Sequence, residues 1–308
     1  MSKWQKSPSR RQFLSGSAAA VAGSMSAGAA AAQTPDPLIT QVQDWASYAG
    51  DGVDEVRYGL PIRFEDDVVR RNVPWLTADP ISSINFTPIH ALDGTITPQG
   101  CAFERHHSGA IELRKQDYRL MVNGLVDRPI ILTYADLERL PRVNHVYFCE
   151  CAANTGMEWA GAQLNGAQFT HGMIHNMEYT GVPLRLVLQQ AGLAAAEDLS
   201  NKWVFVEGAD ASSNGRSIPM EKALDDVIVA FKANGEALRK EHGYPVRLVV
   251  PGWEGNLWVK WLRRIEVTDR SVESREETSK YTDVLANGMA RKWTWVMDAK
   301  SVITAPSP

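Results

Sequence analysis

Short runs of β-branched and aromatic residues, separated by Gly, Pro and Asn, fill the chain from about residue 84 to residue 267. Runs of this length between turn-forming residues are typical of a strand-rich fold. The runs predict strands at residues 118–122, 130–133, 246–250 and 262–267. We expect a tight turn at Asn123-Gly124, directly after the strand at residues 118–122.

Three segments have helix signals instead. Residues 133–140 begin at a capping threonine and end before Pro141. Residues 183–191 begin with proline and are followed by Gly192, and residues 221–227 predict one or two further turns. No internal repeat is visible. The fold class is therefore α+β, mostly β, with the helices as inserts.

The N-terminus has the composition of an export signal. Residues 1–32 contain a basic region, a weakly apolar stretch of small residues and a cleavage site after Ala32, and they contain no acid. The alternative is an amphipathic or disordered tail. Arg10-Arg11 followed by Phe13-Leu14 favours the twin-arginine route, which predicts a periplasmic protein that is exported folded.

The rest of the 308-residue chain is long enough for one large domain or two small ones. Residues 33–84 are polar and irregular, which predicts an N-terminal wrap. Removing the four basic residues of the signal changes the formal net charge from −4 to −8, so nucleic acid is not an expected partner. We expect no membrane association after export, because no apolar run is long enough to span a bilayer.

The three cysteines do not predict a disulfide framework, since their number is odd. Cys149 and Cys151 follow an apolar run, and residues two apart in a strand share one face. If the strand ends between them, Cys149 can pack in the core while Cys151 meets a metal in the following loop. The alternative is that both are small buried hydrophobes, as free cysteines usually are.

Polar residues cluster in four loops of this scaffold. Residues 103–107 combine one guanidinium with two imidazoles, although such a group could also be a surface turn. His242 and Arg247 flank a turn, where they could equally be a helix-end histidine and a strand-edge arginine. Lys260 lies in an apolar run and needs an anionic partner, and Asp210 follows a strand and could be a simple turn residue. Together the cationic loops and a loop cysteine predict a pocket for a phosphorylated, metal-carrying cofactor.

The order and wording of these clusters resemble the molybdenum domain of the sulfite oxidase family, and within it the molybdenum subunits of bacterial sulfane dehydrogenases of the Sox sulfur-oxidation system. The resemblance covers about residues 85–305. The phrases that carry it are Cys101–His107 (CAFERHH), Val146–Trp159 (VYFCECAANTGMEW), Gly161–Gly181, Ser217–Asp226 (SIPMEKALDD), His242–Arg264 and Arg275–Asp283 (REETSKYTD).

The resemblance implies a role for each matching residue. Cys151 would bind molybdenum beside a single molybdopterin, with Cys149 as its structural neighbour. Arg105 and Tyr281 would act on the substrate, Arg105 by orienting an anionic sulfur group and Tyr281 by hydrogen bonding near the metal. The residues implied to hold the cofactor are Phe103, Glu104, Arg105, His106, His107, Asp210, His242, Arg247, Trp258, Val259 and Lys260.

The implied chemistry is oxygen transfer from molybdenum to reduced sulfur, followed by one-electron steps to a cytochrome. The chain has no Cys-x-x-Cys-His haem-attachment motif, so electrons are expected to leave to another polypeptide. The expected partners are a dihaem c-type cytochrome subunit and a sulfur-carrier protein. Free sulfite as the substrate, and a cofactor-free domain that only binds partners, are the alternatives.

Two departures from the family pattern affect these expectations. Family members have two arginines where this chain has Thr155 and Gly156, and the second of them helps to bind sulfite. Its loss favours a bulkier substrate, such as sulfane sulfur on a carrier protein. Residues 85–297 would form the molybdopterin domain, and residues 298–308 would begin an immunoglobulin-like dimerisation domain that is largely absent, which leaves the oligomeric state open.

Overall fold

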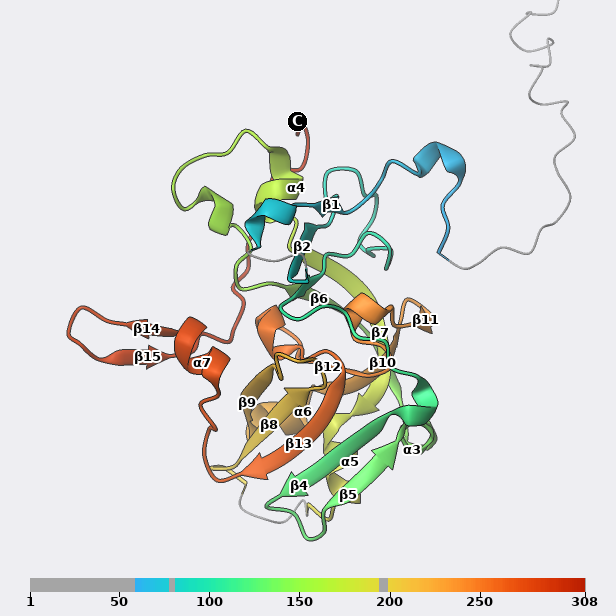
Figure 1. Ribbon diagram of the computed structural model, residues 1–308, viewed down its shortest axis with the longest axis vertical. Helices are drawn as coiled ribbons and strands as arrows, with labels where there is room; N and C mark the ends of the chain where they lie inside the picture. The colour runs from blue at the N-terminus through green and yellow to red at the C-terminus, as the bar shows by residue number, and fades with distance from the viewer. Residues whose placement is uncertain (1–58, 78–80, 194–198, 308) are drawn as a thin grey trace, which may run out of the picture. The chain divides into compact units, whose positions relative to one another are not determined.

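The computed structural model describes residues 59–77, 81–193 and 199–307 (Figure 1). The expected export signal, and the expected wrap before residue 59, lie outside the described residues. The described strands are β1 (Arg71–Asn72), β2 (Ser83–Phe86), β3 (Arg105–His106), β4 (Arg119–Gly124), β5 (Ile130–Thr133), β6 (Val143–Glu150), β7 (Ile174–Pro183), β8 (Trp203–Gly208), β9 (Gly215–Pro219), β10 (Ile228–Ala233), β11 (Glu236–Ala237), β12 (Arg247–Val249), β13 (Leu262–Thr268), β14 (Thr282–Val284) and β15 (Ala290–Lys292). The described α-helices are α3 (Tyr134–Arg139), α4 (Gly166–His171), α5 (Leu184–Gln190), α6 (Met220–Asp225) and α7 (Arg275–Lys280).

Two sheets dominate the described part of the chain. One has the order β11-β10-β7-β6, with β12 also paired to β10, and the other has the order β5-β4-β13-β8-β9. Their pairings are antiparallel except for the parallel pair of β4 and β13. Figure 1 shows α7 and the β14–β15 hairpin at the left, beside the second sheet. The α+β, mostly β prediction is confirmed.

One hydrophobic core joins the two sheets and the helices between them. Alternate residues of β4 are buried, as expected for a strand with one face on a core. Leu120 of β4, Leu188 of α5, Ile218 of β9 and Leu248 of β12 are all fully buried in the same cluster. This core fixes the strand ends that carry the polar loops.

The predicted helices are confirmed where local signals were strong. Thr133 and Asp136 form a capping box at the start of α3. Pro183 precedes α5, and Gly192 after it has a φ of +92°. The structure also contains α6 near the predicted position.

The expected turn at Asn123-Gly124 is wrong. Both residues belong to β4, where they pair with Glu266 and Val267 of β13. Gly124 has a φ of +89°, and a Cβ atom there would lie 2.2 Å from the carbonyl oxygen of Val267. The glycine therefore permits a close approach of two strands, a role that the same dipeptide does not reveal in the sequence.

Glu277 fastens α7 to β9. Its carboxylate accepts hydrogen bonds from the backbone N–H groups of Ser217, at 2.5 Å, and Ser274, at 2.8 Å. The side chain is buried, and it closes the capping box of α7 with Ser274. Because Tyr281 directly follows α7, this carboxylate also sets where Tyr281 lies.

We expect Glu277→Ala to lower the free energy of unfolding by about 2–4 kcal/mol, because it leaves the buried N–H of Ser217 and the half-buried N–H of Ser274 without an acceptor. Urea unfolding followed by circular dichroism measures the change. Glu221→Ala, at an exposed first-turn position of α6, is the matched control and should change stability little. Equal effects of the two substitutions would contradict the role of Glu277.

Candidate functional site

One pocket collects the predicted site residues from loops at the ends of both sheets. Arg105 and His106 come from β3, and Cys151 comes from the loop after β6. Tyr281 follows α7. The predicted residues that line the pocket are Phe103, Glu104, Arg105, His106, His107, Cys151, Asp210, His242, Arg247, Trp258, Lys260 and Tyr281.

Val259 differs from the expectation. Its side chain is fully buried in the hydrophobic core and does not line the pocket. Its backbone carbonyl accepts a hydrogen bond from Leu248, and its N–H donates to Leu257. Val259 therefore holds the turn that presents Trp258 and Lys260, rather than offering its own side chain to a ligand.

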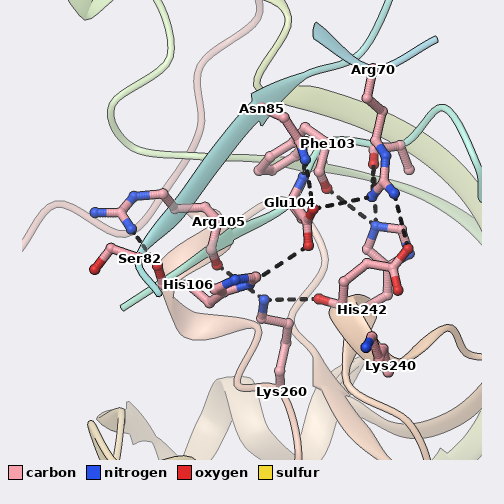
Figure 2. Close-up of polar contacts among 12 residues, drawn as sticks. Arg70, Ser82, Asn85, Phe103, Glu104, Arg105, His106, Lys240, His242 and Lys260 are labelled. Atoms are coloured by element: carbon pink, nitrogen blue, oxygen red, sulfur yellow. Dashed lines mark hydrogen bonds and ion pairs between the residues drawn. The ribbon is translucent and has the colours of Figure 1, made fainter. Parts of the chain in front are cut away.

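The loop at residues 103–107 is held by the segment before it. The N–H of Phe103 donates to the hydroxyl of Thr87 at 2.9 Å, and the N–H of Glu104 donates to Asn85 Oδ1 at 2.7 Å. Asn85 Nδ2 in turn donates to the carboxylate of Glu104 at 2.7 Å (Figure 2). Side-chain caps on both backbone donors fix the loop over the pocket.

The two cysteines separate as the strand pattern predicted. Strand β6 ends at Glu150, so Cys149 is buried while Cys151 is half-buried and lies outside the strand. Both thiols line the pocket. Burial raises the pKa of Cys149 to about 12 and also raises the pKa of Cys151. Without a bound cation, both groups therefore remain thiols at neutral pH.

A buried hydrogen-bond network holds the loop that carries Cys151. The N–H of Cys151 donates a hydrogen bond to the carbonyl of Met173 at 3.0 Å. Asn154 connects this point to the strand end, because it accepts a bond from the N–H of Met173 and donates to Glu150 Oε1, both at 3.0 Å. Lys300 Nζ lies 2.9 Å from the same carboxylate oxygen, and the side chain of Glu150 is only 2 % exposed. The residue between the two cysteines is thus paired with a lysine far along the chain.

Four cationic side chains line the pocket, and their hydrogen bonds go to neutral groups. Arg247 donates to the backbone carbonyls of His242, Leu248 and Trp258. Lys260 donates to two carbonyls, and Arg216 donates to one carbonyl and to an asparagine side chain. Arg105 bonds to the carbonyl of His106 and to the ring of His107. A buried cation without a carboxylate partner is costly, so this pocket favours an anionic ligand.

The nearby carboxylates are engaged elsewhere. Glu104 pairs with Arg70 at 3.7 Å, as Figure 2 shows. Glu241 pairs with the same guanidinium group at 3.2 Å. Ser212 donates a hydrogen bond to Asp210 Oδ2. Arg70 therefore takes up two of the acids that could otherwise neutralise the pocket cations.

Burial and neighbouring positive charges lower the pKa values of the basic groups in the pocket. Burial, followed by the charge of Arg247, lowers the pKa of Lys260 to about 7. Burial and the charges of Lys260 and Arg105 lower the pKa of His106 to about 3. The pKa of His242 is also held well below its usual value, mainly by burial. The imidazoles are therefore neutral at physiological pH, and further positive charge is disfavoured in this pocket.

Several pocket residues have no recognisable sequence signal. His175 lies within β7, where its ring contacts Phe103 and His242. Arg216 lies in β9, Asn256 in a 3-10 turn, and Trp261 has a φ of +51°. Only their arrangement in space brings them to the pocket.

The profile of the oxidoreductase molybdopterin-binding domain matches residues 107–276 of the chain. This match covers more than half of the sequence and includes the cysteine loop and most of the cationic pocket. The chain belongs to the molybdopterin-binding oxidoreductases of the sulfite oxidase family.

Relatives of this family agree with the match. The crystal structure of the sulfane dehydrogenase SoxCD from Paracoccus pantotrophus is similar, with 70 % identity and a TM-score of 0.81, covering 90 % of this chain and 70 % of that chain. Mitochondrial sulfite oxidase from Mus musculus is 32 % identical over 255 residues, which is 79 % of this chain and 45 % of that protein. Nitrate reductase [NADH] from Volvox carteri is 36 % identical over 193 residues, which is 59 % of this chain and 22 % of that enzyme. The chain thus spans less than half the length of these two curated relatives.

The residues present fit the molybdopterin cofactor of this family. Four buried polar atoms in the pocket have no hydrogen-bond partner among the described residues: His106 Nδ1, His175 Nδ1, Asp210 Oδ1 and His242 Nδ1. Such atoms need a ligand or water. The described residues contain no cluster of three or more His, Cys, Asp or Glu side chains suited to a metal. The thiol of Cys151 offers a soft sulfur donor that suits the metal of such a cofactor.

No helix in the described ranges is long and apolar enough to cross a membrane.

Lys260→Met should make the stability of the cofactor-free protein less dependent on pH. The pKa of Lys260 is about 7 in the folded protein and about 10.4 in an unfolded chain. Between these values the unfolded chain binds more protons, so wild-type stability should rise with pH relative to the variant. Urea unfolding from pH 6 to pH 10 measures this difference. The exposed Lys240→Met is the matched control, and parallel curves for wild type and Lys260→Met would contradict the shift.

Proposed function

We propose that this chain is a periplasmic molybdenum oxidoreductase that oxidises sulfane sulfur bound to a carrier protein and passes the electrons to a c-type cytochrome. One observation carries the proposal: the half-buried Cys151 at a strand end opens into a pocket whose cations have no carboxylate partner among the described residues. The 70 % identity to a sulfane dehydrogenase supports the substrate class. The Arg10-Arg11 motif supports export by the twin-arginine route.

The cofactor would be held by the cationic pocket. Arg247 and Lys260 offer charge and hydrogen bonds to the phosphate, and the neutral imidazole of His242 offers a hydrogen bond to the pterin. Cys151 offers a sulfur ligand to molybdenum, and metal binding would require the loss of its proton. When bound, the cofactor supplies oxygen transfer to sulfur and storage of two electrons.

The chain's own residues would orient the substrate. Arg105, half-buried at the pocket, would attract the anionic sulfur group. Burial raises the pKa of Tyr281, although Arg216 partly opposes this, so its hydroxyl keeps its proton and can donate a hydrogen bond. Each oxidation step is balanced as R–S–S⁻ + H₂O → R–S–SO⁻ + 2 H⁺ + 2 e⁻, where R is the carrier and the cytochrome accepts the electrons.

Cys151→Ser should remove both molybdenum and activity, because a hydroxyl is a poor substitute for a thiolate ligand. Cys149→Ser should retain molybdenum and mainly lower stability, since it places a hydroxyl in the core. Metal analysis, a steady-state assay and thermal unfolding of proteins made with a working cofactor pathway test both variants. If Cys149→Ser loses molybdenum and Cys151→Ser retains it, the metal ligand is Cys149. If the wild-type protein itself contains no molybdenum, the enzyme proposal is overturned in favour of a domain that only binds partners.

A sulfite:cytochrome c oxidoreductase is the second candidate, favoured by the identity of 32 % to a sulfite oxidase. Assays with cytochrome c and either sulfite or a carrier that bears sulfane sulfur separate the two. We expect the carrier to give the higher kcat/KM, because Thr155 and Gly156 replace the two arginines of the family pattern. Fast oxidation of free sulfite without a carrier would reverse this order.

A further inference from the structure

We propose that Arg216 binds the anionic end of the sulfur substrate and so supplies a cation that the loop at Gly156 lacks. The substrate class is a terminal sulfur anion, either a sulfane sulfur or a sulfur oxyanion. This inference rests on the proposed function for the reaction, but anion binding at Arg216 can be measured without it.

The position of Arg216 is unusual for an arginine. It lies in β9, its side chain is buried, and it lines the same pocket as Cys151 and Tyr281. Its Nη1 donates to the carbonyl of Gly215 at 2.7 Å, and its Nε donates to Asn256 Oδ1 at 2.9 Å. These two bonds hold the guanidinium in place.

The charge of Arg216 has no direct counter-ion among the described residues. The nearest link to an acid passes through Asn256, whose Nδ2 donates to Glu254 Oε2 at 2.6 Å. A buried guanidinium that is fixed by neutral acceptors is available for an anion, and guanidinium groups bind oxyanions through parallel hydrogen bonds.

Arg216 is placed beside the other substrate-facing residue. Its guanidinium carbon lies 4.8 Å from the ring centroid of Tyr281, a distance typical of a cation–π contact. The carboxylate of Glu277 binds Ser217 N–H and caps α7, so it holds the strand of Arg216 and the helix before Tyr281 together. The two side chains thus form one rigid pair at the pocket.

The loop that carries Gly156 contributes no charge here. Thr155 has a φ of +68° and Gly156 starts a short 3-10 turn, and neither residue lines the pocket. A Cβ atom on Gly156 would have no neighbour within 4 Å among the described residues. The cation of the pocket is therefore supplied by β9 and not by this loop.

The test uses the molybdenum-loaded protein in four forms: wild type, Arg216→Gln, Arg216→Lys and the exposed control Arg114→Gln. Calorimetric titration with inorganic sulfate measures anion binding without turnover. Steady-state assays with cytochrome c give kcat and KM for sulfite and for a carrier that bears sulfane sulfur. Molybdenum content and melting temperature report whether each variant is intact.

We expect Arg216→Gln to weaken sulfate binding and to raise KM by about 10- to 100-fold, the range for loss of a charged hydrogen bond. A smaller change in kcat would distinguish substrate binding from a structural role. Arg216→Lys should recover part of the loss because it keeps the charge, and Arg114→Gln should match wild type.

If Arg216→Gln has the same sulfate affinity and the same KM as the wild-type protein, the proposal is overturned. If that variant fails to fold or to load molybdenum, Arg216→Lys decides: weaker sulfate binding at an unchanged melting temperature supports the proposal, and unchanged binding overturns it. A wild-type protein that binds sulfate through Arg216, but oxidises neither sulfur compound, would overturn the proposed function alone.

Discussion

Positive charge without carboxylate partners governs this site. Arg247 and Arg216 are buried, and together with Lys260 they are fixed by carbonyl and amide oxygens that carry no full charge. Removing such groups from water costs free energy that neutral acceptors only partly recover. The protein tolerates this because its core and its strand pairings hold the loops in place, and an anionic cofactor offsets the cost when it binds.

The separation of the charges depends on Arg70. This residue lies just before β1 and pairs with Glu104 and Glu241, two acids that lie at the pocket. If those carboxylates turned toward Lys260, the pocket would neutralise itself and lose its attraction for anions. The described part of the N-terminal segment thus shapes the charge of the pocket, although in the sequence it resembles an irregular wrap.

The parts of the structure that were predictable from the sequence have local causes. Thr133 caps α3 and Pro183 begins α5 through contacts within a few residues, and the end of β6 follows from the small residues after Cys151. The residues that were missed depend on distant neighbours. Arg216 is one side chain in an ordinary strand, and His175 faces the pocket only because β7 pairs with β6 along its length. Gly124 shows the same limit in the fold, since its close neighbour is Val267 on another strand.

The contact of Glu150 with Lys300 has a consequence for how the protein is made. In a growing chain, Glu150 emerges from the ribosome about 150 residues before its lysine partner. Until Lys300 arrives, the carboxylate between the two cysteines is an uncompensated buried charge, which disfavours the closed arrangement of the strand end. The cysteine loop therefore reaches its final form only after Lys300 has been synthesised, so a segment far along the chain contributes to the shape of the pocket.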